Sequence, residues 1–244
     1  MSKPSMRAAF AAVTTLFFAW GFITSLIDPL VAAVKGIFTL SDLQAQLSAF
    51  AFFIAYGLVS FPAAVLLGRL RAVPTILLAL AMMALACLVM LVAANLAVYT
   101  LVLLGLFVLA SGITILQVAA NPLAAALGDP KGSHFRLTLS QTFNSLGTFL
   151  GPLLGATLFL EGVEVNEGTA ITPEVRDAAL AGIDRAYFWI CGLIVPLLVG
   201  ALSDQAGYVT ALIAPAACYA LLCVFAIAAG RAVVIARAEA PVLH

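Results

Sequence analysis

The chain has 244 residues, of which 64% are hydrophobic and 9% are charged, and its formal net charge is zero. Soluble domains carry about 25% charged residues, so this composition excludes a chain whose whole surface faces water. The neutral charge balance also argues against a nucleic-acid partner. With a mean hydropathy of +1.18, the chain is expected to be a polytopic membrane protein embedded in a lipid bilayer.

Apolar runs divide the chain into predicted membrane spans, since a helix needs about 20 apolar residues to cross a bilayer. In chain order the candidate runs are 8–34, 46–68, 73–96, 98–127, 138–160, 186–203 and 208–230. The first run is too long for a signal peptide, and we predict that it is retained as a helix. The acidic segment 161–185 contains no run that could cross and is expected to be a solvated loop.

The distribution of lysine and arginine predicts the orientation, because cytoplasmic loops carry an excess of these residues. A cytoplasmic N-terminus places the larger group inside, namely Lys3, Arg7, Arg69, Arg71, Lys131 and Arg136. It leaves Lys35, Arg176 and Arg185 outside. Seven crossings would, however, also leave Arg231 and Arg237 outside, against the rule.

Polar side chains recur at helical spacing in three of the runs. They are Trp20, Thr24 and Asp28 in the first, Ser111, Thr114, Gln117 and Asn121 in the fourth, and Thr138, Gln141, Asn144, Ser145 and Thr148 in the fifth. Polar groups inside a membrane are costly and often mark a solute path, so these stripes indicate a shared water-filled cavity. The alternative is that they hold the helices together by hydrogen bonds.

Asp28 is the only carboxylate within any of the apolar runs, and no lysine or arginine lies within a run to neutralise it. Burial without a cation raises the pKa of a carboxyl group. Such a group can gain and lose a proton near neutral pH, as proton-coupled transport requires. The alternative is that Asp28 is hydrated at the outer end of its helix, before Pro29.

Two residue patterns predict packing and not chemistry. Gly147, Gly151 and Gly155 recur every four residues, which lets another helix approach closely. The cysteines lie in apolar runs without metal-binding or redox spacing and are expected to be small buried residues, with no metal or cofactor. They are Cys87, Cys191, Cys218 and Cys223.

Three segments carry a family resemblance. They are FFAWGFITSLIDPL at Phe17–Leu30, QVAANPLAAALG at Gln117–Gly128 and HFRLTLSQTFNSLG at His134–Gly147. They resemble the L-fucose permease family of the major facilitator superfamily, which includes glucose/galactose and N-acetylglucosamine permeases. The resemblance implies an all-α integral membrane fold of about seven transmembrane helices here, built on the six-helix N-terminal half of a twelve-helix transporter.

The resemblance also implies an activity, which is proton-coupled uptake of a monosaccharide across the bacterial cytoplasmic (inner) membrane by alternating access. Asp28 matches the family's proton-coupling aspartate. The implied sugar-binding residues are Gln141, Asn144, Gln117, Asn121, Thr24 and Trp20. Gln117 stands where the fucose permease has a glutamate used in coupling, and Thr24 and Ser25 replace an Asn-Asn pair. These departures favour a glucose/galactose or N-acetylglucosamine type of relative.

The last part of the chain departs further from the family. After DRAYFWI the sequence resembles the end of the family's eleventh helix and its twelfth helix. We therefore predict an N-terminal transporter half over 1–190 and, over 191–244, a remnant of the last two helices of the C-terminal half. Helices seven to ten of the family are then missing, by an internal deletion, a gene-model join or a truncation. The alternative is a natural compact seven-helix protein.

Two other functions of helical membrane proteins each require residues that the predicted spans lack. A retinal protein requires a lysine in its last helix, and 208–230 contains none. An intramembrane aspartyl protease requires two aspartates acting as a dyad, and the spans contain Asp28 alone. We therefore expect a transporter and not an enzyme, with a non-transporting remnant of a permease as the alternative. Transport by this chain on its own would require a homodimer.

Overall fold

The fold is helical. The computed structural model describes residues 6–26, 35, 38, 40–96 and 98–158, and from the remainder 172, 181–182, 187–188, 190–192 and 194. These all belong to Met1–Leu197, the first of two compact units in the chain. The main helices are α1 (Met6–Ser25), α3 (Asp42–Leu70), α4 (Ala72–Leu96), α5 (Tyr99–Ala126) and α6 (Ser133–Leu158), with a short 3-10 helix η1 (Pro130–Gly132) before α6.

The five long helices correspond to the first five predicted runs and confirm them as helices over the described residues. The last part of the first run, residues 27–34, lies outside the described residues. The run at 208–230 and most of the run at 186–203 lie outside the described residues, as does Asp28. The predicted division at residue 190 therefore stays a prediction, and so does the number of transmembrane helices.

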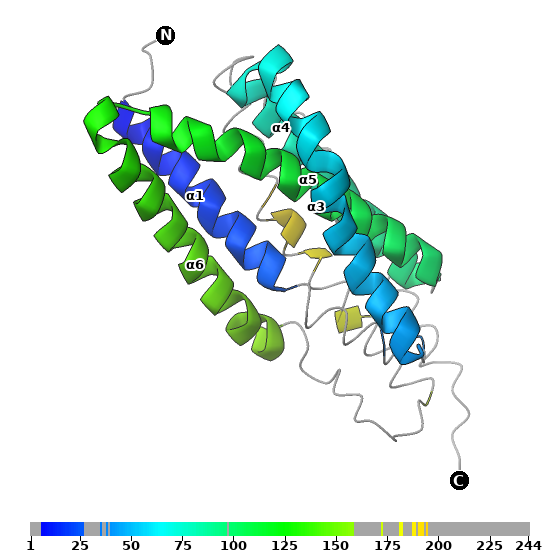
Figure 1. Ribbon diagram of the computed structural model, residues 1–244. Helices are drawn as coiled ribbons and strands as arrows, with labels where there is room; N and C mark the ends of the chain where they lie inside the picture. The colour runs from blue at the N-terminus through cyan, green and yellow to red at the C-terminus, as the bar shows by residue number, and fades with distance from the viewer. Residues whose placement is uncertain are drawn as a thin grey trace, which may run out of the picture. The chain divides into compact units, whose positions relative to one another are not determined.

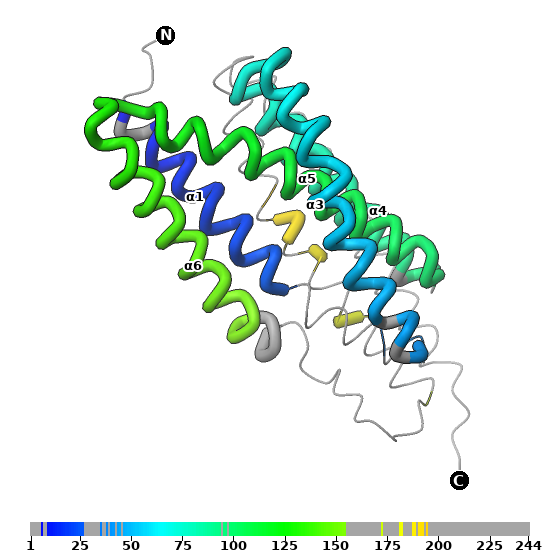
Figure 2. The backbone as a smooth tube through the Cα atoms, in the orientation of Figure 1, coloured from blue at the N-terminus to red at the C-terminus, as the bar shows by residue number. Residues whose placement is uncertain are grey.

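The helix α5 occupies the centre of the described bundle. It packs closely against α3 and α4 and also touches α1 and α6, while α1 and α6 form a closely packed pair (Figure 1). The backbone path in Figure 2 shows the same pairing of α1 with α6. In the most apolar 18-residue stretch of each helix, 61% is buried in α5 and 17% in α3. The residues on α5 therefore decide what the interior of this bundle contains.

Length and composition identify the membrane-crossing helices. Three described segments are long and apolar enough to cross, namely Gln46–Leu70, Ala72–Ala93 and Tyr99–Ala126, and Ala9–Ser25 forms a shorter apolar run. Large apolar side chains on α3 are exposed, including Phe53 at 60% and Phe61 at 77%, as expected for a surface facing hydrocarbon. The helix α6 is less apolar because polar residues recur along it.

Glycines explain how α1 and α6 come so close. A methyl group added at Gly147 would lie 2.8 Å from the backbone nitrogen of Phe22, and one at Gly151 would lie 2.8 Å from the carbonyl oxygen of Phe22. On the facing helix, a methyl group at Gly21 would lie 2.7 Å from the Asn144 side chain. The predicted role of Gly147 and Gly151 in close helix approach is confirmed, and α1 is the helix that approaches.

The connection from α5 to α6 is fixed by an arginine. The Arg136 guanidinium donates hydrogen bonds to the carbonyl oxygens of Ala124 (3.3 Å), Ala125 (2.6 Å) and Asp129 (2.9 Å). The carbonyls at the end of a helix have no partner within the helix and attract a positive charge. Gly128 has a φ of +107°, which a side chain would strain. Arg136 therefore holds the end of α5 against the start of α6.

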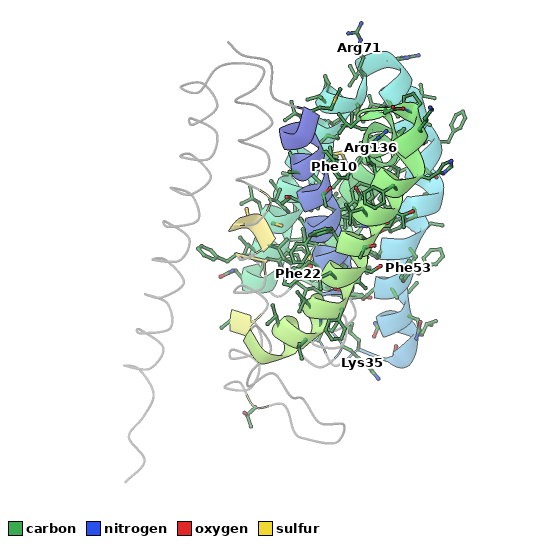
Figure 3. All side chains as sticks on the ribbon, turned by 90° about the vertical axis from the view of Figure 1, so that its left-hand side faces the viewer. Phe10, Phe22, Lys35, Phe53, Arg71 and Arg136 are labelled. Atoms are coloured by element: carbon green, nitrogen blue, oxygen red, sulfur yellow. The ribbon has the colours of Figure 1, made fainter. Side chains whose placement is uncertain are left out.

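The basic residues that can be placed lie at the two ends of the bundle. Figure 3 shows Arg71 and Arg136 toward one end of the helices and Lys35 toward the other. The charge distribution predicts Arg71 and Arg136 on one side of the membrane and Lys35 on the other, and their placement agrees with that prediction. Which of the two ends faces the cytoplasm stays a prediction.

Candidate functional site

Two of the expected site amides form a pair between α5 and α6. The Gln141 Nε2 donates a hydrogen bond to the Asn121 Oδ1 at 3.3 Å. Gln141 is exposed and Asn121 is half-buried, so neither amide is sealed inside the bundle. Each carboxamide has both donors and acceptors beyond this one bond. The pair can therefore offer hydrogen bonds to a solute that reaches this face.

Asn144 lies differently, between α6 and α1. Its Nδ2 donates to the carbonyl oxygen of Phe17 at 3.1 Å. One turn further on, the Thr148 hydroxyl donates to the Asn144 carbonyl oxygen of its own helix at 3.0 Å and lies 3.5 Å from the carbonyl oxygen of Gly21. The bond from the Asn144 side chain crosses the closely packed helix pair, so Asn144 links α6 to α1. Asn144 remains half-buried, and its amide oxygen makes no hydrogen bond to the described residues.

The serine and threonine of the α5 stripe are buried and hydrogen-bonded within their own helix. Ser111 and Thr114 are each 3% exposed. Their hydroxyls donate to the carbonyl oxygens of Phe107 (2.7 Å) and Ala110 (2.8 Å), four residues earlier in the same helix. Short hydroxyl side chains readily form this bond and so bury themselves without a partner on another helix. The structure therefore gives no support to a cavity-lining role for Ser111 and Thr114, nor to a hydrogen bond from them to another helix. Gln117 and Asn121 are the members of this stripe that remain candidates for contact with a solute.

Three helices meet at a second polar cluster. The hydroxyl of Tyr56 on α3 interacts with the side chains of Thr24 on α1 and Gln117 on α5. All three residues are half-buried. The Thr24 Oγ1 atom itself is buried and has no partner in hydrogen-bonding geometry within the described part of the chain. The interaction with Tyr56 is therefore an approach between polar groups and not a formed hydrogen bond.

Of the two remaining expected residues of the first predicted span, the structure describes Trp20 and does not describe Asp28. Trp20 is 9% exposed, and its ring lies 5.2 Å from the ring of Phe17, tilted by 46°. The indole is thus packed within the bundle, with little of it open to a solute. Asp28 lies outside the described residues, and its role in proton coupling stays a prediction.

Tyr56 was missed by the sequence reasoning. It sits in the apolar segment AFAFFIAYG, where it looks like a lipid-facing aromatic residue. A weak signal existed, because Ser48, Phe52 and Tyr56 follow one another at four-residue steps on one face of α3. That face is directed into the bundle, since Ser48 and Phe52 are buried. The polar groups on it therefore meet other helices.

The described site is built from neutral hydrogen-bonding groups. It contains carboxamides and hydroxyls from α1, α3, α5 and α6, and these groups can both donate and accept. Among the described residues no cluster of His, Cys, Asp or Glu side chains is arranged to hold a metal ion. Neutral groups of this kind can exchange hydrogen bonds with a polyhydroxylated solute.

Comparison with known proteins gives the family. The family model described as Major Facilitator Superfamily matches residues 9–163. The chain therefore belongs to the major facilitator superfamily. The all-α membrane fold expected from the sequence is that of this family.

Individual relatives cover part of their own length. The chain is 49% identical over 159 residues to a glucose/galactose transporter of Brucella abortus, a match that covers 65% of this chain and 39% of the relative. It is 38% identical over 154 residues to the L-fucose-proton symporter of Escherichia coli, covering 63% and 35%. The crystal structure of the Escherichia coli fucose:proton symporter superposes with a TM-score of 0.67 at 29% identity, covering 79% of this chain and 48% of that one.

Two consequences follow from these matches. The chain spans less than half the length of the relatives it matches. Its apolar helices and its bacterial relatives indicate an integral protein of a bacterial inner membrane.

Proposed function

We propose that this chain is a monosaccharide permease that couples sugar uptake to protons, of the glucose/galactose, fucose or N-acetylglucosamine class. The observation that carries the proposal is the amide pair Gln141–Asn121, held at a solute-accessible position between α5 and α6. The names of the relatives support it, since they include a glucose/galactose transporter and an L-fucose-proton symporter.

The proposed sugar contacts follow from accessibility. Gln141, Asn121 and Gln117 offer carboxamide groups at exposed or half-buried positions. The side-chain oxygen of Asn144, which has no hydrogen bond to the described residues, adds an acceptor, while its nitrogen donates to the Phe17 carbonyl oxygen of α1. Thr24 contributes a hydroxyl, and Trp20 contributes at most the edge of a packed ring.

Asp28 is the proposed proton carrier, on the grounds of its sequence position alone. It is the one carboxylate in an apolar run. Desolvation favours the protonated form, and a proton gradient can then load and unload the group. The cytoplasmic N-terminus is proposed with it, from the distribution of basic residues.

Alternating access needs two halves that rock about a shared site. If the chain acts by itself, we propose that two copies supply the halves as a homodimer. The competing proposal is a non-transporting remnant of a permease, which the partial coverage of the relatives supports.

The test is uptake of labelled sugar into proteoliposomes under an inward proton gradient. The panel contains L-fucose, D-glucose, D-galactose and N-acetylglucosamine, and the variant is Asp28→Asn. Asp129→Asn is the matched control, because Asp129 is a carboxylate in the loop before α6. Gradient-driven uptake that Asp28→Asn abolishes and Asp129→Asn retains supports the proposal. Absence of uptake of every sugar by folded protein supports the non-transporting remnant.

A further inference from the structure

Thr24 differs from the other hydroxyl residues of α1. Thr14, Thr15 and Ser25 each donate a hydrogen bond to a carbonyl oxygen of their own helix, at 2.9, 3.0 and 2.9 Å. Thr24 makes no such bond, and its buried Oγ1 has no hydrogen-bond partner in the described part of the chain. Buried polar groups are almost always paired in folded proteins. An unpaired one therefore calls for an explanation.

The surroundings of this hydroxyl point to a ligand. Tyr56 approaches it from α3, and Tyr56 also interacts with Gln117 from α5. Three neutral groups from three helices thus converge at half-buried positions. Packing alone would not need this arrangement, because valine in place of Thr24 would fill the same volume without an unpaired oxygen.

The hydrogen-bonding capacity of the cluster matches a sugar hydroxyl. A threonine hydroxyl and a tyrosine hydroxyl each donate and accept, and a carboxamide has two donors and one acceptor oxygen. A sugar hydroxyl also donates one hydrogen bond and accepts others. One sugar hydroxyl can therefore pair with the Thr24 hydroxyl and with the Gln117 carboxamide at the same time.

We propose that Thr24, Tyr56 and Gln117 form a subsite for one hydroxyl group of the monosaccharide, in which Tyr56 orients the Gln117 carboxamide. Tyr56 is a positioning residue that no sequence pattern assigned. The inference rests on the proposed sugar-binding function and deepens it, because it places part of the recognition on α3.

The experiment measures sugar affinity and thermal stability for the wild type, Tyr56→Phe, Thr24→Val and the double variant. The probes are labelled D-glucose, D-galactose and L-fucose with purified full-length protein. Each single variant is expected to weaken binding by about tenfold. Thr24→Val removes one hydrogen bond to the sugar hydroxyl, and Tyr56→Phe releases the Gln117 carboxamide that makes the other. The fold-loss in sugar affinity of the double variant should be much smaller than the product of the two single fold-losses, since both residues serve one sugar hydroxyl.

Stability separates this role from a structural one. Thr24→Val removes an unpaired buried oxygen, so the midpoint of thermal unfolding should rise while sugar affinity falls. Tyr99→Phe is the matched control. The Tyr99 hydroxyl donates to the Gln44 carbonyl oxygen at 2.6 Å and lies 3.1 Å from the Ser48 hydroxyl, so its loss should lower stability and leave affinity unchanged.

Deoxy sugars identify the hydroxyl involved. The analogue that lacks the recognised hydroxyl should bind weakly to the wild type and lose nothing further in Tyr56→Phe. The inference is overturned by unchanged sugar affinity in Tyr56→Phe, or by a lowered unfolding midpoint in Thr24→Val. Absence of sugar binding by the wild type overturns the proposed function itself, and this subsite with it.

Discussion

The close pairing of α1 with α6 depends on glycine at position 147, where any side chain would collide with the backbone of α1. The substitution Gly147→Ala tests this dependence. The added methyl carbon would lie 2.8 Å from the Phe22 nitrogen and closer still to the Phe18 carbonyl oxygen. Both are backbone atoms of α1 and cannot move without moving the helix. Restoring a contact distance of about 3.5 Å requires the helices to separate by roughly 1 Å.

The magnitude follows from overpacking and from the bonds that cross the interface. Forcing an extra methyl group into a packed interior costs about 1–3 kcal/mol. The hydrogen bond from Asn144 to the Phe17 carbonyl oxygen would also lengthen, at a cost of about 0.6 kcal/mol for a bond within a membrane. The expected loss in free energy of unfolding is about 2–4 kcal/mol. At about 2–4 °C per kcal/mol for a chain of this size, the unfolding midpoint falls by roughly 4–16 °C.

Buried thiols provide the assay. Cys87 and Cys191 are both fully buried, so a thiol-reactive dye labels them when the protein unfolds on heating. Cys218 and Cys223 are replaced by serine to keep the signal specific. The control is Gly57→Ala on α3, because nothing lies within 4 Å of the added carbon. An unfolding midpoint for Gly147→Ala equal to that of Gly57→Ala would refute the packing argument.

Two further predictions concern the helix connections and use the same assay. Arg71 links α3 to α4 with φ 67° and ψ 174°, a region that suits glycine and costs other residues about 1–3 kcal/mol. Arg71→Gly should therefore raise the unfolding midpoint, and a fall would show that the arginine makes contacts that outweigh the strain. Arg136→Lys should lower the midpoint, because an ammonium group cannot reach the three carbonyl oxygens that the guanidinium fork holds. Lys131→Gln removes an exposed charge from the same loop and should leave the midpoint unchanged.

The helices could be predicted from the sequence because hydropathy reports burial in a bilayer directly. Runs such as 73–96 and 98–127 match α4 and α5 to within a residue or two. The run at 138–160 begins later than α6, which starts at Ser133. Hydropathy detects the part of a helix that contacts hydrocarbon, and α6 continues through His134 and Arg136 beyond that part.

The rotation of each helix could not be predicted in the same way. In a membrane, apolar side chains cover both the inner and the outer faces, so the polar stripe is the main guide to orientation. That guide worked for Gln141 and Asn121, which meet between α5 and α6. It failed for Ser111 and Thr114, because their hydroxyls pair with carbonyl oxygens of their own helix and need no partner on another helix.

The same distinction explains which polar residues are candidates for function. Many hydroxyls in the described bundle donate to a carbonyl oxygen four residues earlier, as in Thr75 and Thr142. Such a hydroxyl carries little information about a solute. Thr24 is the exception on α1, and it lies opposite a tyrosine that interacts with a carboxamide. A polar group that the fold leaves unpaired has a hydrogen bond still to make. The position of Thr24 therefore argues for a bound solute more strongly than the number of polar residues in the spans.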